Sequence, residues 1–275
     1  MRFCQFVLFC LFIPNLAAQD SPPPGASGTQ TPYVEREEKL FNFFPGGKIV
    51  ISTGAPGSLK IVGWPKSSVR VEAEKIVYYL SAEQAKTEIQ QSPLRVRWNQ
   101  TSATVRTSAA PSDNLEVNLT LYVPRDKTDI KATIRQGDFS IEGVNGWVET
   151  SIAIEGSIEA KGMSGYFSAN TLRGDISVEM AGKCWNGLEF GVVTQHGSAN
   201  LLLPITYSAA LQLETRDGKI AVDYPPQVVE GEPTPPDILI RKNSQSLKAS
   251  VGAGGAPIKL VTYSGNVQLS KKDPE

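Results

Sequence analysis

The residue types that usually build a catalytic or metal site are scarce in this chain. It has one histidine, His196, and three cysteines, of which Cys4 and Cys10 lie in an apolar N-terminal stretch and only Cys184 lies beyond it. A Ser/His/Asp or Cys/His pair would need His196, which stands beside a glycine and is expected to be a solvent-facing turn residue. Cys184 is expected to be a small buried hydrophobe. The sequence predicts no catalytic residue, no metal and no cofactor.

Carboxylates offer two other kinds of chemistry. A calcium site needs several oxygen ligands close together, whereas Asp138 and Asp175 are far apart and are expected on a solvated face. Glycoside hydrolysis needs two carboxylates about 5 to 10 Å apart, and outward-facing Glu149 and Glu159 could approach that spacing on adjacent strands. Any acidic surface offers such pairs by chance. An enzyme acting on polysaccharide, as a lyase or a hydrolase, is therefore the alternative to a non-enzymatic role.

Three aromatic residues have a spacing that suggests a binding surface. Trp147 and Tyr166 each follow a glycine, 19 residues apart, and Trp185 lies a further 19 residues along the chain. If one turn of the fold takes about 19 residues, the three side chains form a ladder on one face. Exposed aromatics in a row can stack on sugar rings or anchor a protein partner. They can equally stack on one another and stiffen the column, and both interpretations stay open.

The elements that must position these residues carry a repeat. Its pattern is a glycine, any residue, an apolar residue, any residue, and an apolar or small residue. Copies start 9 or 10 residues apart from Gly137 to Gly174, so that two copies make a unit of about 19 residues. The full set starts at Gly47, Gly57, Gly137, Gly146, Gly156, Gly165, Gly174, Gly197, Gly218 and Gly265.

Fixed-period self-similarity of this length predicts an all-β, single-domain β-solenoid, like a parallel β-helix, with about 19 residues per coil. Each coil would lie about 4.8 Å from the next and pair with it through backbone hydrogen bonds. Apolar residues alternate with polar ones in most other segments, as at Val69, Val71 and Ala73. A two-sheet β-sandwich would also show alternation and glycine turns, and it is the alternative.

One short helix is expected near residue 81. Ser81 and Gln84 have the spacing of a capping box, Ala85 and Ile89 follow at helical spacing, and Pro93 ends the segment. This helix or the N-terminal strands would cover an end of the stack, because an uncovered coil invites edge pairing.

The two ends and one internal stretch differ from the repeat region. Residues 1–18 have the charged start, apolar middle and small-residue end of a signal peptide cleaved after Ala18. The apolar stretch is shorter than the roughly 20 residues that a membrane anchor needs, and a lipid anchor at Cys10 would need a small residue where Phe9 stands. We expect a Pro/Ser-rich linker at 19–33, the β-solenoid domain at 34–272 with a Pro-rich loop at 224–237, and a charged tail at 273–275.

These features predict an exported protein, in the periplasm, at the cell surface or outside the cell, with no transmembrane span in the mature chain. The 27 Lys and Arg residues nearly balance the 28 Asp and Glu residues, which leaves a formal charge of −1. Nucleic acid is therefore not an expected partner.

The repeat and the opening strands resemble one bacterial family. Residues 38–51 (EKLFNFFPGGKIVI) and 57–64 (GSLKIVGW) resemble the start of the DUF4097 family, whose members are named as candidate adhesins. Residues 194–201 (TQHGSANL) and 214–220 (ETRDGKI) look like its repeated coil. The resemblance spans about residues 38–270 and implies an exported β-solenoid with no catalytic residue. Residues 181–191 and 224–237 depart from the pattern and put the coil register there in doubt.

The sequence thus favours a non-enzymatic exported binding or scaffold protein that presents a β-solenoid surface to a glycan or an envelope protein. The polysaccharide-active enzyme is the alternative, and a structural envelope component without a ligand is the third hypothesis.

Overall fold

The computed structural model describes residues 31–223, 229–230, 233–234 and 245–272. The expected signal peptide at 1–18, most of the linker at 19–33, most of the loop at 224–237 and the tail at 273–275 lie outside the described residues. The chain separates into two units, Met1–Gln30 and Thr31–Glu275, and the features below belong to the second unit.

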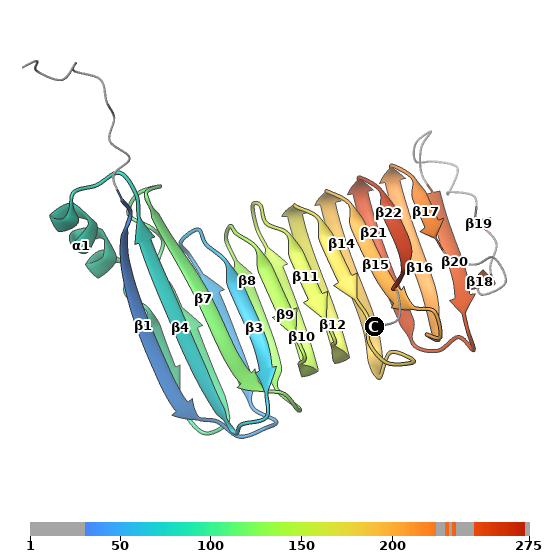
Figure 1. Ribbon diagram of the computed structural model, residues 1–275, viewed down its shortest axis with the longest axis horizontal. Coiled ribbons are helices and arrows are strands. Elements are labelled where there is room, and N and C mark those ends of the chain that lie inside the picture. Colours follow the sequence, from blue (N-terminus) through green and yellow to red (C-terminus); the bar gives the residue numbers. More distant parts are fainter. Residues whose placement is uncertain (1–30, 224–228, 231–232, 235–244, 273–275) are drawn as a thin grey trace, which may run out of the picture. The chain divides into compact units, whose positions relative to one another are not determined.

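Strands and one helix make up the described secondary structure, which confirms the expected all-β class with one short helix (Figure 1). The first sheet contains, in spatial order, β1 (Tyr33–Asn42), β4 (Ser68–Val77), β7 (Leu115–Pro124), β3 (Leu59–Trp64), β9 (Phe139–Glu142), β11 (Ile158–Lys161), β13 (Ile176–Glu179), β15 (Ala199–Pro204), β22 (Val267–Lys272) and β17 (Ile220–Asp223). The second contains β18 (Val229–Glu230), β20 (Gln245–Val251), β16 (Ala209–Asp217), β21 (Pro257–Ser264), β14 (Gly187–His196), β12 (Ser164–Arg173), β10 (Asn145–Ile152), β8 (Asp129–Ile134), β2 (Lys48–Thr53), β6 (Ser102–Arg106) and β5 (Arg95–Trp98), with β19 (Pro233–Thr234) paired to β20.

Consecutive strands from β8 to β17 alternate between the two sheets. From β8 to β15, each strand therefore pairs in parallel with a strand two positions away in the chain, as β10 does with β12 and β11 with β13. Strands β16 and β17 instead pair in parallel with β21 and β22. Trp147 lies opposite Tyr166, 19 residues later, which is the period that the repeat predicted. Antiparallel pairs such as β1 with β4 and β16 with β20 stand at the two ends, so both sheets are mixed.

One hydrophobic core lies between the two sheets and draws on both of them. The period-two alternation places the apolar residues inside, so that Val69, Val71 and Ala73 of β4 are buried while the residues between them are half-exposed. Two sheets that share one core are also a feature of the sandwich alternative.

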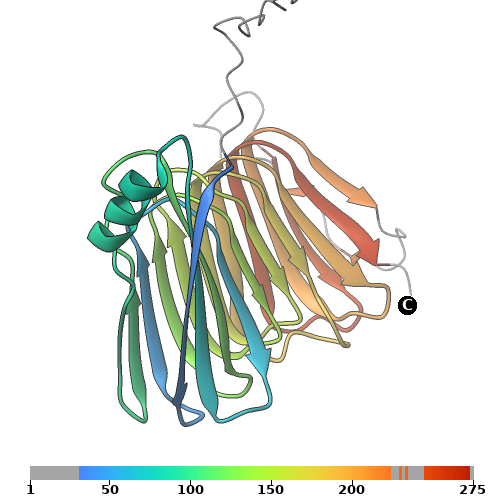
Figure 2. The same ribbon diagram turned by 60° about the vertical axis from the view of Figure 1, so that its left-hand side comes forward.

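Helix α1 (Ala82–Gln91) begins at the predicted capping box. The Ser81 side chain accepts from the Gln84 backbone N–H, and the Gln84 side chain accepts from the Ser81 backbone N–H. Ala85 and Ile89 are buried against the core. The helix connects β4 of the first sheet to β5 of the second and packs against β1 and β4, beside the blue edge strand in Figure 2.

A column of glycines forms one corner between the sheets. After the first glycine of the column, each glycine lies against the carbonyl group of the one before, so an added Cβ would fall 2.0–2.1 Å from that carbonyl oxygen. Gly174 also has a φ of +142°, which side chains rarely adopt. The column consists of Gly57, Gly137, Gly156, Gly174, Gly197 and Gly265. The repeat glycines are therefore fixed by backbone packing.

Polar side chains bind the backbone at the same corner. Asp138 Oδ1 accepts from the Ser157 N–H and Asp175 Oδ1 from the Ser198 N–H, both at 2.8 Å. These aspartates are exposed, as expected, and they also join neighbouring strand turns. On the inner side, buried Thr194 donates from Oγ1 to the Gly174 carbonyl oxygen at 2.9 Å.

The buried threonines give a matched test of these hydrogen bonds. Thr194→Val should lower the free energy of unfolding by about 1 to 2 kcal/mol, because the Gly174 carbonyl loses a buried donor. Thr150→Val should be neutral or stabilising, since the Thr150 Oγ1 atom is buried without a hydrogen-bond partner among the described residues. Urea denaturation of both variants measures the difference. Equal losses would contradict the assignment.

Candidate functional site

Two of the three predicted aromatic residues form an exposed stack. Trp147 of β10 and Tyr166 of β12 are direct partners in the parallel pair, and their ring centroids are 3.9 Å apart with an interplanar angle of 18°. Trp147 is 43% exposed and Tyr166 is half-buried. Parallel register places equivalent side chains one strand spacing apart, which is close to the stacking distance of aromatic rings.

A shallow hollow of about 470 Å³ runs beside this stack. Four glycines line it without side chains: Gly146, Gly165 and Gly187 from three neighbouring strands, and Gly46 from the turn before β2. An added Cβ at Gly187 would fall 1.7 Å from the Gly165 carbonyl oxygen, so close backbone packing requires glycine there. Because these positions carry no side chains, the flank of the aromatic stack stays open to solvent.

The rim of the hollow carries one cation, one carboxylate, one amide and one apolar side chain. They belong to Lys127, Asp129, Asn145 and Leu188. Leu188 is 71% exposed. Lys127 comes from the connection between β7 and β8, where its φ is +57°. No sequence signal identified Lys127 or Leu188, because neither belongs to the glycine repeat.

Two hydrogen bonds fix the position of Trp147. Its backbone N–H donates to Asp129 Oδ1 at 3.2 Å, and its indole Nε1–H donates to Glu149 Oε1 at 2.8 Å. The indole hydrogen bond and the nearby Lys131 ammonium, whose Nζ lies 3.4 Å from Glu149 Oε2, hold the pKa of Glu149 below its ordinary value of 4.5. The ring therefore has a charged acceptor at neutral pH.

The environment of Trp147 should accordingly depend on acid pH. A carboxylate with a lowered pKa contributes its stabilisation above its unfolded-state pKa and loses it as the pH falls through the folded-state pKa. The Trp147 indole signal should therefore change in an acid transition whose midpoint lies below 4.5. Comparing the near-UV circular dichroism of the protein with that of Glu149→Gln isolates this step. An unchanged acid transition in Glu149→Gln would contradict the assignment.

Trp185 does not join the stack, and the prediction of a three-residue ladder is wrong in that part. Its side chain is only 4% exposed and meets Phe190 edge-on at a centroid distance of 5.2 Å. Tyr166 is instead opposite Glu189, after a register shift between Gly165 and Tyr166. The chain between β12 and β14 is longer than one 19-residue unit, so Trp185, although 19 residues after Tyr166, lies before β14 and its side chain enters the core.

The other residues considered from the sequence do not converge. His196 is exposed at the end of β14, as expected. Cys184 is exposed, so the prediction of a buried cysteine is wrong. Glu149 lies on β10 of the second sheet and Glu159 on β11 of the first, each on an outward position, so these two carboxylates do not form a hydrolytic pair.

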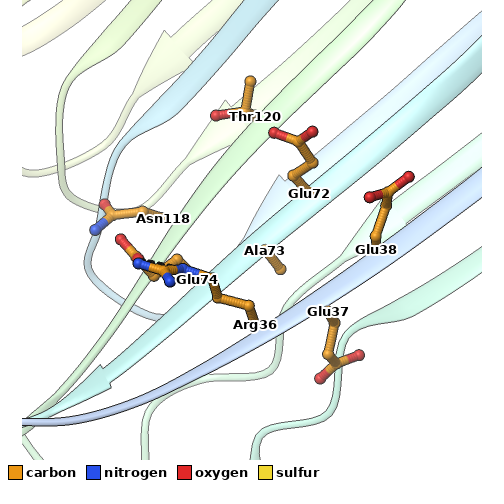
Figure 3. A pocket seen from close by; sticks show the side chains of 8 residues that line it. All are labelled: Arg36, Glu37, Glu38, Glu72, Ala73, Glu74, Asn118 and Thr120. Atoms are coloured by element: carbon orange, nitrogen blue, oxygen red, sulfur yellow. Dashed lines mark hydrogen bonds and ion pairs between the residues drawn. The ribbon is translucent and has the colours of Figure 1, made fainter.

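A second hollow, of about 430 Å³, lies on the outer face of β1, β4 and β7 (Figure 3). Arg36 Nη2 reaches Glu74 Oε1 at 2.6 Å, whereas Glu38 and Glu72 are direct cross-strand partners of like charge. Glu37 points away and contacts the buried Lys75 ammonium. In the described part of the chain no three His, Cys, Asp or Glu side chains are grouped to hold a metal ion.

Within the described ranges no helix has both the length and the apolar character that crossing a membrane requires.

No protein-family model matches this sequence, and no curated protein matches it. Similar solved structures include a candidate cell adhesion protein from Clostridium sporogenes, with 11% identity, a TM-score of 0.47, and coverage of 86% of this chain and 100% of the other. A candidate adhesin from Bacteroides fragilis has 8% identity, a TM-score of 0.34 and coverage of 86% and 97%. A candidate lipid-binding protein from Parabacteroides distasonis has 10% identity, a TM-score of 0.29 and coverage of 86% and 97%. Structural similarity at this level is not evidence that the proteins share a function.

Proposed function

We propose that this chain is a non-enzymatic glycan-binding protein that holds a saccharide against the Trp147–Tyr166 stack. The observation that carries the proposal is an exposed aromatic pair beside an open, glycine-lined hollow. Pyranose rings present a face of C–H groups that packs on aromatic rings, while their hydroxyl groups need hydrogen-bond partners at the edge. Both kinds of surface lie together here.

The chemistry of the rim favours a neutral saccharide. Lys127 and Asp129 contribute opposite charges and Asn145 contributes an amide that can both donate and accept. Neither an anionic nor a cationic sugar gains a net electrostatic attraction from such a set. The span of Gly146, Gly165 and Gly187 covers two strand spacings, or about 10 Å, which suits two sugar rings.

We also propose that the parallel strands form a β-solenoid that is exported, with the domain limits expected from the sequence. The regular alternation between sheets, the 19-residue register and the column of corner glycines support coils. The apolar stretch at residues 6–13 supports export. Membership of the DUF4097 family rests on the segments named above.

A glycan array probed with the whole chain, followed by analysis of the bound saccharide for cleavage, tests the function. The proposal expects binding of neutral oligosaccharides without bond cleavage. Cleavage would instead support the polysaccharide-active alternative. Absence of binding to any glycan would overturn the proposal and leave the aromatic pair a structural stack.

A further inference from the structure

We propose that Asn186, which directly precedes the hollow-lining Gly187, is a site of spontaneous deamidation, and that the equivalent Asn145 is protected by the fold. Both residues precede a glycine, in Asn186–Gly187 and Asn145–Gly146. Glycine after asparagine favours deamidation because it leaves the attacking backbone nitrogen unhindered. Gly146 and Gly187 are both register partners of Gly165, on opposite sides, so the two sites lie at matched positions around the hollow.

The reaction needs only water. The Gly187 backbone nitrogen attacks the side-chain amide carbon of Asn186 and forms a new C–N bond. The amide C–N bond breaks, and ammonia leaves with the proton from Gly187. Water then opens the cyclic imide at either carbonyl, which gives aspartate or isoaspartate.

The backbone at Asn186 leaves the attacking nitrogen available. Asn186 is exposed and lies outside any strand, just before β14 begins. Its carbonyl accepts from the Gly165 N–H at 2.8 Å, and in a parallel ladder this pattern turns the Gly187 N–H away from β12. On the other side, β21 first pairs with β14 at Phe190 and Ile258, too late to accept from Gly187.

The same ladder protects Asn145. It belongs to β10, pairs with Ser164, and donates its own N–H to the Arg125 carbonyl at 2.7 Å. The Ser164 N–H donates to the Val144 carbonyl at 3.2 Å, a pattern that aims the Gly146 N–H at β12. Imide formation there requires the strand to open first.

Peptide mapping by mass spectrometry after incubation of the folded chain in mildly alkaline buffer tests the inference. Trypsin separates the sites, with Asn145 in residues 136–161 and Asn186 in residues 184–216. Asn186 should deamidate at least about tenfold faster than Asn145, because strand opening limits the latter. In denaturant the two rates should become similar, and Asn186→Gln should remove the fast product.

Equal rates in the folded chain, or a faster reaction at Asn145, would overturn the inference. So would a folded chain in which neither site reacts while both react in denaturant. The consequence for ligands rests on the proposed function: a new charge or an extra backbone methylene beside Gly187 and Leu188 should weaken saccharide binding several-fold. Peptide mapping detects deamidation whether or not the chain binds a saccharide. The deamidation proposal and the proposed glycan-binding function can therefore be disproved separately.

Discussion

Gly174→Ala should destabilise the protein by about 3 kcal/mol or more. The new methyl group would lie 2.1 Å from the Gly156 carbonyl oxygen, and the φ of +142° is one that alanine avoids. Relief would require two neighbouring corners to separate, and the buried Thr194 hydroxyl would then lose its Gly174 acceptor. A large loss of stability is expected because the methyl group would clash with backbone atoms of Gly156, which cannot shift as a flexible side chain could.

Gly162→Ala is the matched control. Gly162 also has a positive φ, +56°, but an added Cβ would meet nothing within 4 Å. The cost should therefore be about 1 kcal/mol, from backbone strain alone. Thermal and urea denaturation of the two variants measure the contrast. Similar losses at both positions would show that the glycine column is not a close-packed corner.

Trp147→Ala should weaken saccharide binding by about tenfold or more, which corresponds to at least about 1.4 kcal/mol of binding free energy. The change removes the half-exposed ring while leaving the backbone of β10 paired on both sides. Glu149 keeps Lys131 as a partner after the indole is removed. Folding should therefore change much less than binding.

Trp98→Ala is the control for a general effect of losing an exposed tryptophan. Trp98 is 51% exposed and stacks on Phe41 at a centroid distance of 4.8 Å, away from the hollow. Its loss should leave saccharide affinity unchanged in calorimetric titrations. If Trp98→Ala reduces the affinity as much as Trp147→Ala does, the saccharide is not held by the proposed stack.

Local signals predicted much of the fold. The capping box at Ser81 acts within four residues, so it was readable from the sequence and starts α1 as expected. The alternation of apolar and polar residues predicted that Val69 and Val71 are buried, because successive side chains of a strand point to opposite faces and only one face meets the core. The corner glycines were readable because backbone packing leaves no room for another residue at Gly156 or Gly174.

The candidate site was readable only where the repeat is regular. Trp147 and Tyr166 stack because an unbroken parallel pair joins them. The 19-residue spacing predicted the wrong position for Trp185, because the extra residues before β14 change the register. The Trp185 side chain is instead buried in the core. The sequence also suggested that Glu149 and Glu159 could approach each other on adjacent strands. They do not, since strands that follow one another in the chain here belong to opposite sheets.

The indole N–H resonances of the chain give the most direct test of the proposed function. The four tryptophans lie in distinct surroundings: Trp64 donates to the Ser68 carbonyl, Trp98 stacks on Phe41, Trp147 donates to Glu149 and Trp185 is in the core. Titration of a ¹⁵N-labelled chain with the saccharide found on the array should shift the Trp147 indole signal and leave the other three in place. A shift at Trp98 or Trp64 with Trp147 unmoved would contradict binding at the Trp147–Tyr166 stack.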